Sequence, residues 1–174
     1  MPTTTADSSI SPSPWHAIYT RPRAEKQVWQ RLQDAGIEAF LPLRKTLRQW
    51  SDRKKMVEVP LLSSYVFVRV DRTEYDQVLR VPGVVKYIFF EGKAAVIRQQ
   101  EIDNLKILID SNAEVETTWE RFEKGEHVEV TAGALRGLKG ELISDGTRKR
   151  LLIRIDRIDQ NLVVEVSPGL VRKA

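Results

Sequence analysis

The run VTAGALRGLKG, residues 130–140, determines how the second half of this chain is interpreted. Its three glycines, Gly133, Gly137 and Gly140, can supply the backbone angles that a tight strand–turn–strand connection requires. The run contains a lysine but lacks the spacing of a nucleotide-binding loop, and no helical pattern follows it. We therefore predict a turn between two strands here and not a phosphate-binding site.

Around that turn the apolar residues recur with a period of two, which is typical of β-strands. Four short strands are predicted around residues 128–130, 141–143, 151–155 and 162–166. Turn-forming residues separate them, including Asp145-Gly146 and Asp159-Gln160-Asn161. Residues 123–174 are therefore predicted to form a small β-barrel, an architecture that leaves no exposed strand edge.

The first half, residues 15–112, mixes strand and helix patterns. Residues 15–20 and 64–70 are predicted strands, and the second is apolar on both faces, as in a central strand. Three helices are predicted. The first has Pro22 in its first turn and ends before Gly36, the second runs from a cap at Asp71 or Thr73 to Leu79, and the third lies around residues 102–109. Hairpins are predicted around residues 44–55 and 91–93. This order predicts an α+β fold, an antiparallel sheet with helices as in a ferredoxin-like sandwich.

Composition narrows the class of protein. Hydrophobic residues make up 41% and charged residues 30% of the 174-residue chain, the balance of a folded globular protein. There is no cysteine, and no apolar run approaches the roughly 18 residues of a membrane helix, so we expect a cytoplasmic protein with no membrane partner. Residues 1–14, rich in Thr, Ser and Pro, are expected to form a disordered tail. Residues 113–122, with three glutamates and one arginine, are expected to form an acidic linker.

Catalytic chemistry has little support in the sequence. The two histidines, His16 and His127, lie in different halves of the chain, and neither has a ligand or nucleophile beside it. A metal site or a Ser-His-Asp triad needs several such groups together. We therefore predict no metal, no cofactor and no catalytic residue, and expect a binding protein and not an enzyme.

Positive charge is concentrated in the first half, where residues 15–110 contain 17 basic and 12 acidic residues. Such a surplus favours a polyanionic partner. The first predicted hairpin carries basic residues around one tryptophan, opposed only by Asp52: Arg44, Lys45, Arg48, Trp50, Arg53, Lys54 and Lys55. Basic side chains can hold phosphates while a tryptophan stacks on an unpaired base. A solvated loop with Trp50 folded onto the domain would explain the same residues, so both alternatives stay open at this point.

A second candidate surface is apolar. Tyr19, Leu61, Leu62 and Tyr65 are expected at the ends of adjacent strands, where the chain reaches the surface. Ordinary core residues have the same character. An open apolar pocket at this place would, however, suit the tip of a partner's helix.

Four motifs together resemble the NusG family of transcription elongation factors over nearly the whole chain. Trp15-x-x-x-Tyr19, followed by a basic residue and a helix, resembles the opening of the family's N-terminal domain. LLSSYVFV, residues 61–68, stands where the family has Phe-Phe-Pro-Gly-Tyr-Val-hydrophobic-Val. Residues 81–84, VPGV, resemble its valine-proline-x-valine step, and residues 125–140 resemble the KOW motif of its C-terminal barrel. The motifs occur in the family's order across two domains.

The resemblance implies a non-enzymatic factor that binds RNA polymerase and suppresses pausing and termination. It implies a NusG N-terminal domain at residues 15–112 and a KOW barrel at residues 123–174. The clamp helices of the polymerase would be bound by the apolar residues Tyr19, Leu61, Leu62 and Tyr65. The non-template DNA strand would face the start of the first helix, with Arg21, Arg23 and Lys26. The ribosome, through its small subunit, or a termination factor would meet the KOW loop at Ala134, Leu135 and Arg136.

Departures from the family pattern point to a specialised member, similar to RfaH or to the UpxY-type antiterminators. Leu61-Leu62 replaces an aromatic pair, and Ser63-Ser64 replaces Pro-Gly. Leu135 replaces a phenylalanine of the housekeeping factor, which favours antitermination over contact with a termination factor. An RNA- or ribosome-binding KOW protein and a housekeeping NusG remain the alternatives, and the sequence does not identify a target operon.

Overall fold

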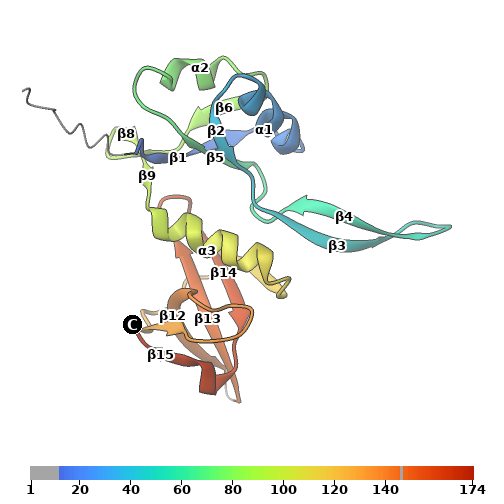
Figure 1. Ribbon diagram of the computed structural model, residues 1–174, viewed down its shortest axis with the longest axis vertical. Coiled ribbons are helices and arrows are strands. Elements are labelled where there is room, and N and C mark those ends of the chain that lie inside the picture. Colours follow the sequence, from blue (N-terminus) through green and yellow to red (C-terminus); the bar gives the residue numbers. More distant parts are fainter. Residues whose placement is uncertain (1–11, 146) are drawn as a thin grey trace, which may run out of the picture.

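A computed structural model describes residues 12–145 and 147–174 and has two parts, with helix α3 between them (Figure 1). Most of the predicted tail, residues 1–14, lies outside the described residues. A two-stranded ribbon projects from the N-terminal part (Figure 1). As predicted, the fold combines an antiparallel sheet carrying helices with a C-terminal part built from strands.

The N-terminal part is built on an antiparallel sheet of order β2-β5-β1-β6, with β9 also paired to β1. Its helices are α1 (Glu25–Asp34), α2 (Tyr75–Leu79) and α3 (Gln99–Asp110). Its sheet strands are β1 (Trp15–Thr20), β2 (Glu38–Phe40), β5 (Tyr65–Arg69), β6 (Val84–Tyr87) and β9 (Val96–Ile97). Two hairpins stand apart from this sheet, one made of β3 (Leu43–Gln49) and β4 (Lys54–Pro60), the other of β7 (Phe89–Phe90) and β8 (Lys93–Ala94). Strand β5 is central, as its apolar sequence predicts.

The observed helix ends confirm one prediction from the sequence and correct two. Gly36 takes a φ of +77° just after α1, so the predicted end of that helix is confirmed. Pro22 lies in a turn before α1 and not in its first turn, because the helix begins only at Glu25. The expected cap of α2 is also wrong. The Asp71 carboxylate accepts hydrogen bonds from the backbone N–H groups of Thr73 and Glu74, which closes a turn before the helix begins.

The C-terminal part is an antiparallel sheet of order β10-β14-β13-β12-β11-β15. Its strands are β10 (Val115–Thr118), β11 (Glu126–Val130), β12 (Lys139–Asp145), β13 (Arg148–Ile155), β14 (Gln160–Glu165) and β15 (Val171–Lys173), with the short 3-10 turn η1 (Pro168–Leu170) before β15. The four predicted strands are present, and β15 was missed.

Strand β10 corrects the predicted linker, because residues 115–118 pair with β14 and belong to the C-terminal sheet. Val115 is buried, whereas Glu114 and Glu116 on either side of it are exposed. This is the alternation of an edge strand with one solvated face. The glutamates gave the segment an acidic composition that concealed the strand pattern.

One apolar core joins the two parts. Ile102, Leu105 and Leu108 of α3 are buried in a cluster that also contains β-strand residues from both parts. A second, smaller cluster lies in the N-terminal part and includes Val28 and Leu32 of α1. Helix α3 therefore packs as the layer between the N-terminal sheet and the C-terminal sheet.

Candidate functional site

The four residues of the predicted apolar surface, Tyr19, Leu61, Leu62 and Tyr65, do come together. Tyr19 at the end of β1 is the direct strand partner of Tyr65 at the start of β5. The two rings meet edge to face with centroids 5.7 Å apart. Leu61 and Leu62 lie in the turn that leads into β5.

Ser64 holds this turn in place. Its φ of +67° lies in the left-handed region, which favours glycine and costs other residues energy. Its backbone N–H donates to Glu25 Oε1 at 2.8 Å, and its carbonyl accepts from the Thr20 N–H at 2.9 Å. A serine thus occupies a backbone conformation suited to the glycine that the family motif has at this position.

The two leucines of the apolar surface are buried in this arrangement, whereas Tyr19 and Tyr65 are half-buried. Leu62 is 0% exposed and Leu61 is 4% exposed, and both belong to the core shared with the C-terminal part. The Thr117 hydroxyl of β10 donates to the Leu61 carbonyl at 3.3 Å. The expected pocket is therefore closed at its leucines in this arrangement, and β10 of the C-terminal part lies against Leu61.

The four residues between β13 and β14, here named the closing turn (residues 156–159), lie beside the N-terminal part. The Asp156 N–H donates to Glu101 Oε1 at 3.3 Å, and its carboxylate lies 3.1 Å from the Arg98 guanidinium. The Arg157 guanidinium lies 3.6 Å from the centre of the Phe90 ring, and Ile158 is buried in the shared core.

Asp159, the last residue of the closing turn, acts on the apolar surface through its charge. The pKa of Tyr65 is raised, first by burial and then by the neighbouring Tyr19 and Asp159, because each of these disfavours the phenolate. The closing turn thus places a carboxylate next to the tyrosine pair.

Buried polar side chains of α3 complete the contact between the two parts. Asn104 Nδ2 donates to the Lys139 carbonyl at 3.0 Å, and the Lys139 N–H donates to Asn104 Oδ1 at 3.2 Å. Glu101 is 3% exposed and also accepts the Arg98 N–H at 2.8 Å. Sequence reasoning missed these residues, although polar side chains beside Ile102 and Leu105 on the apolar face of a helix are a usable signal.

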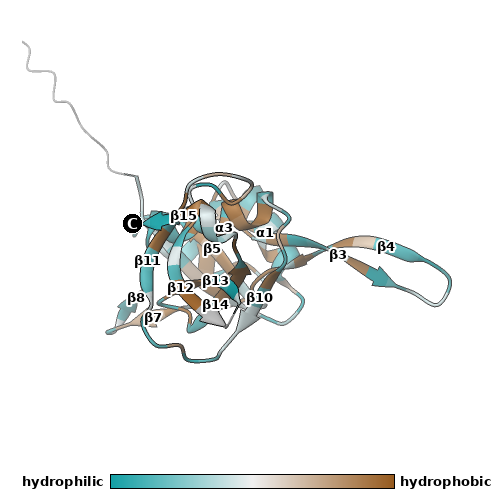
Figure 2. Cartoon of the chain, turned by 90° about the horizontal axis from the view of Figure 1, so that it is seen from below, coloured by the Kyte–Doolittle hydropathy of each residue, from teal (hydrophilic) through white to brown (hydrophobic). Residues whose placement is uncertain are grey.

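The basic ribbon, β3 and β4, projects away from the body of the molecule (Figure 2). The Trp50 N–H donates to the Arg53 carbonyl at 2.7 Å and closes its tip. The Trp50 side chain is 54% exposed, so the alternative in which it folds onto the domain is wrong. Arg48 is paired directly with Lys55 across the ribbon, an arrangement of like charges that destabilises a sheet unless an anion binds there.

The cations of the ribbon differ in their surroundings. Arg44 Nη1 donates to the Val115 carbonyl at 3.1 Å and so joins the ribbon to β10. In the described part of the chain, no acidic side chain forms an ion pair with the other predicted cations of the ribbon, which are Lys45, Arg48, Arg53, Lys54 and Lys55. Arg21, Arg23 and Lys26 form a second exposed group, on the turn before α1 and in its first turn. We infer that these two groups are accessible to a polyanion.

The KOW loop (residues 133–140) has the backbone that its glycines predict. Gly133 and Gly137 have φ values of +83° and +88°. Gly140 serves another purpose, because a Cβ there would lie 2.6 Å from Ile153 Cδ1 and 2.8 Å from the Leu152 carbonyl oxygen. Ala134 and Arg136 are exposed, and Leu135 is half-buried against the shared core.

The two histidines lie in different surroundings. His16 is buried with Nδ1 2.9 Å from the Ala95 carbonyl oxygen, and His127 is exposed with Nε2 4.0 Å from Glu141. Across residues 12–145 and 147–174, no group of three or more side chains that could hold a metal ion was found. In the same residues, no helix is long and apolar enough to cross a membrane.

Comparison with known proteins identifies the family. The family model "Transcription termination factor nusG" matches residues 13–106, more than half of the chain. The chain belongs to the NusG family. NusG of Rickettsia prowazekii (strain Madrid E), described as a transcription termination/antitermination protein, is 22% identical over 172 residues, which cover 92% of this chain and 90% of that protein. NusG of Rickettsia felis is 21% identical over 171 residues, 91% of this chain and 89% of that protein.

The fold of a solved NusG structure agrees with this assignment. The structure "Domain interaction in Thermotoga maritima NusG" has a TM-score of 0.52 and 18% identity, and the match covers 92% of this chain and 96% of that chain. The protein is therefore a NusG-family transcription factor. The predicted α+β fold, an N-terminal NusG domain followed by a strand-rich C-terminal domain of the KOW type, is confirmed, although, among the described residues, β10 leaves one strand edge unpaired.

Proposed function

We propose that the protein binds the clamp helices of RNA polymerase through the apolar surface and acts as an antitermination factor. The observation that supports this is the meeting of Tyr19, Leu61, Leu62 and Tyr65 at one end of the N-terminal sheet. Aromatic and leucine side chains gathered in this way suit the end of a partner's helix. The factor is expected to act at specific operons in the cytoplasm.

Binding through this surface requires the KOW domain to move away. Leu61 and Leu62 share a core with the C-terminal part, and Asp159 of the closing turn acts on Tyr65. A polymerase that binds only the open form draws the population toward that form, at a cost equal to the free energy of opening. The closed arrangement would therefore weaken binding until the two parts separate.

The two exposed basic groups are proposed to contact the non-template DNA strand. The ribbon offers Arg48, Lys55 and the exposed Trp50 at positions where a single strand can be held and stacked. Arg21, Arg23 and Lys26 would hold phosphates beside α1. Arg44 is the exception, because its guanidinium binds the Val115 carbonyl while the molecule is closed.

The KOW loop is proposed to meet the small subunit of the ribosome after opening, through Ala134, Leu135 and Arg136. Leu135 is half-buried against the shared core, and Gly137 faces Ile107 of α3, so part of this loop becomes accessible only when the parts separate. The leucine at position 135 supports antitermination over recruitment of a termination factor.

A run-off transcription assay across a pause site and a terminator tests the proposal. With RNA polymerase present, added protein is expected to raise the fraction of full-length transcript. An increase in terminated transcript would instead indicate a housekeeping NusG. Unchanged transcription, together with binding of structured RNA by the full-length chain alone, would indicate an RNA-binding KOW protein.

A further inference from the structure

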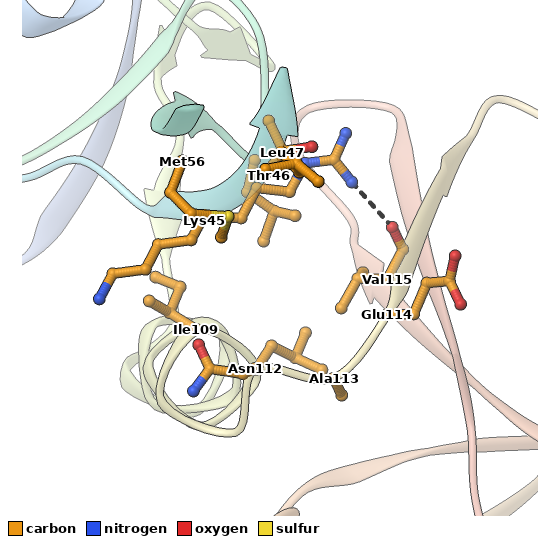
Figure 3. A pocket seen from close by; sticks show the side chains of 12 residues that line it. Lys45, Thr46, Leu47, Met56, Ile109, Asn112, Ala113, Glu114 and Val115 are labelled. Atoms are coloured by element: carbon orange, nitrogen blue, oxygen red, sulfur yellow. Dashed lines mark hydrogen bonds between the residues drawn. The ribbon is translucent and has the colours of Figure 1, made fainter. Parts of the chain in front are cut away.

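A cleft of about 480 Å³ lies between the base of the basic ribbon, the end of α3 and the start of β10 (Figure 3). Its walls are mainly apolar, from Leu47, Met56, Leu61, Ile109, Ala113 and Val115. The apolar surface proposed to bind polymerase contributes only Leu61 to it. The cleft overlaps the proposed polymerase- and DNA-binding residues only at Leu61 and at the base of the ribbon, and the function proposed above gives its other residues no role.

The ribbon side of the cleft carries two apolar side chains that are more than half exposed. Leu47 and Met56 are directly paired across β3 and β4 and are 57% and 56% exposed. A two-stranded ribbon is marginally stable by itself and gains from packing on one face. A pair of large apolar residues at the centre of such a ribbon is therefore a place for a partner to pack.

The cleft runs along the edge of β3 and ends at the start of β10. Residues 44–47 of β3 line it consecutively, and so do residues 112–115 on the opposite side. Consecutive residues of a strand point to opposite faces, so a cleft that touches four in a row lies beside the strand's edge. In the described residues, β3 pairs only with β4 and β10 pairs only with β14, so each has an edge without a strand partner. An unpaired edge can accept the main chain of an extended peptide.

Charge at the rim favours an acidic occupant. Arg44 and Lys45 lie at the ribbon side, and Glu114 is the acidic residue among those lining the cleft. The rest of the ribbon adds Arg48, Lys54 and Lys55 to the positive field. Nucleic acid fits less well in the cleft, because none of the described residues lining it is aromatic and most of its wall is apolar.

We propose that this cleft binds an extended segment of a partner protein in which apolar and acidic residues alternate. The main chain of the segment adds to the free edge of β3, its apolar side chains pack on Leu47, Met56 and Ile109, and its carboxylates, on the other face of the added strand, face Arg44. Because residues 113–115 lead into the C-terminal sheet and Arg44 binds Val115, the cleft is complete only in the closed form. The segment would therefore favour closure, opposite to the effect proposed for polymerase.

Fluorescence anisotropy with a defined probe tests the proposal on the full-length chain. The probe is a labelled eight-residue peptide of alternating leucine and glutamate, and its comparison peptide has lysine in place of glutamate. Saturable binding of the glutamate peptide is expected, with the lysine peptide at least about tenfold weaker. Met56→Glu and N-methylation of alternate peptide bonds are each expected to weaken binding about tenfold or more. Val85→Glu, at a half-exposed valine on β6, is the matched control and is expected to change nothing.

Several results would overturn the proposal. These are no saturable binding, equal binding by Met56→Glu whose circular dichroism matches the parent chain, or tolerance of N-methylation. Displacement of the probe by a single-stranded oligonucleotide, in a manner sensitive to Met56→Glu, would assign the cleft to nucleic acid instead. Self-association that Met56→Glu abolishes would assign it to a second copy of the chain. None of these readouts depends on polymerase, so the function proposed above is tested separately.

Discussion

Ile158→Asp is expected to open the molecule while leaving both parts folded. Ile158 lies in the closing turn, is 3% exposed and belongs to the core that the two parts share. Burying an isoleucine side chain is worth about 1.5–3 kcal/mol. Burying an unpaired carboxylate in its place costs several kcal/mol more, a cost that the open form avoids. The closing equilibrium should therefore shift by at least about 2 kcal/mol, or roughly thirtyfold.

Hydrogen exchange measures this shift directly. In the parent chain the backbone N–H of Lys139 donates to Asn104 Oδ1 at 3.2 Å across the two parts, and its exchange should quicken about thirtyfold in the variant. Leu170→Asp, at a residue 37% exposed in η1, is the control and should leave that exchange unchanged. Equal protection in Ile158→Asp and the parent chain would refute the role of the closing turn. Loss of protection throughout β13 and β14 would instead show that Ile158 stabilises the barrel itself.

Three further outcomes are expected. Ser64→Gly should raise the free energy of unfolding by about 0.5–1 kcal/mol in chemical denaturation, because it relieves a left-handed serine; a decrease would contradict this. Replacing Arg53, Lys54 and Lys55 by glutamine should flatten the salt dependence of single-stranded DNA binding by about one unit of slope per lost phosphate contact. An unchanged slope would show that the ribbon is a solvated loop that does not bind DNA. Burial raises the pKa of Tyr87, so the stability contributed by its neutral phenol is complete below the unfolded pKa near 10 and is lost as the pH rises above that value. In urea titrations at alkaline pH, Tyr87→Phe should therefore lose less stability than the parent chain. An equal loss in both would exclude Tyr87 as the source.

Elements that are marked by the spacing and type of neighbouring residues were predicted from the sequence. The apolar face of α1, the end of that helix at Gly36 and the glycine backbone of the KOW loop all follow from spacing and residue type. Strand β10 was missed because its solvated face carries glutamates, so composition outweighed an alternation only four residues long. Strand β15 was missed for a similar reason, since only Val171 in it is apolar.

Whether the C-terminal part lies against the candidate site could not be predicted from local sequence patterns. The sequence correctly brought Tyr19 and Tyr65 together, because cross-strand pairing follows from the order of the strands. Leu62 belongs to a core that includes residues of the C-terminal part almost one hundred positions away. The closing turn resembles an ordinary hairpin connection in sequence, and only its position against Phe90 and Glu101 gives it a role. The Leu62→Glu variant, a natural test of an open pocket, is unsuitable for a fully buried side chain.

The affinity of the opened chain for RNA polymerase tests the central proposal most directly. Dissociation constants for core polymerase should be measured for the parent chain, Ile158→Asp, and Ile158→Asp combined with Tyr65→Ala or, as control, Phe89→Ala. Opening should tighten binding by about thirtyfold, and Tyr65→Ala should remove about 2 kcal/mol, or roughly thirtyfold, whereas the exposed Phe89 should not matter. Unaltered affinity on opening, or equal affinity with and without the Tyr65 side chain, would contradict binding through the apolar surface.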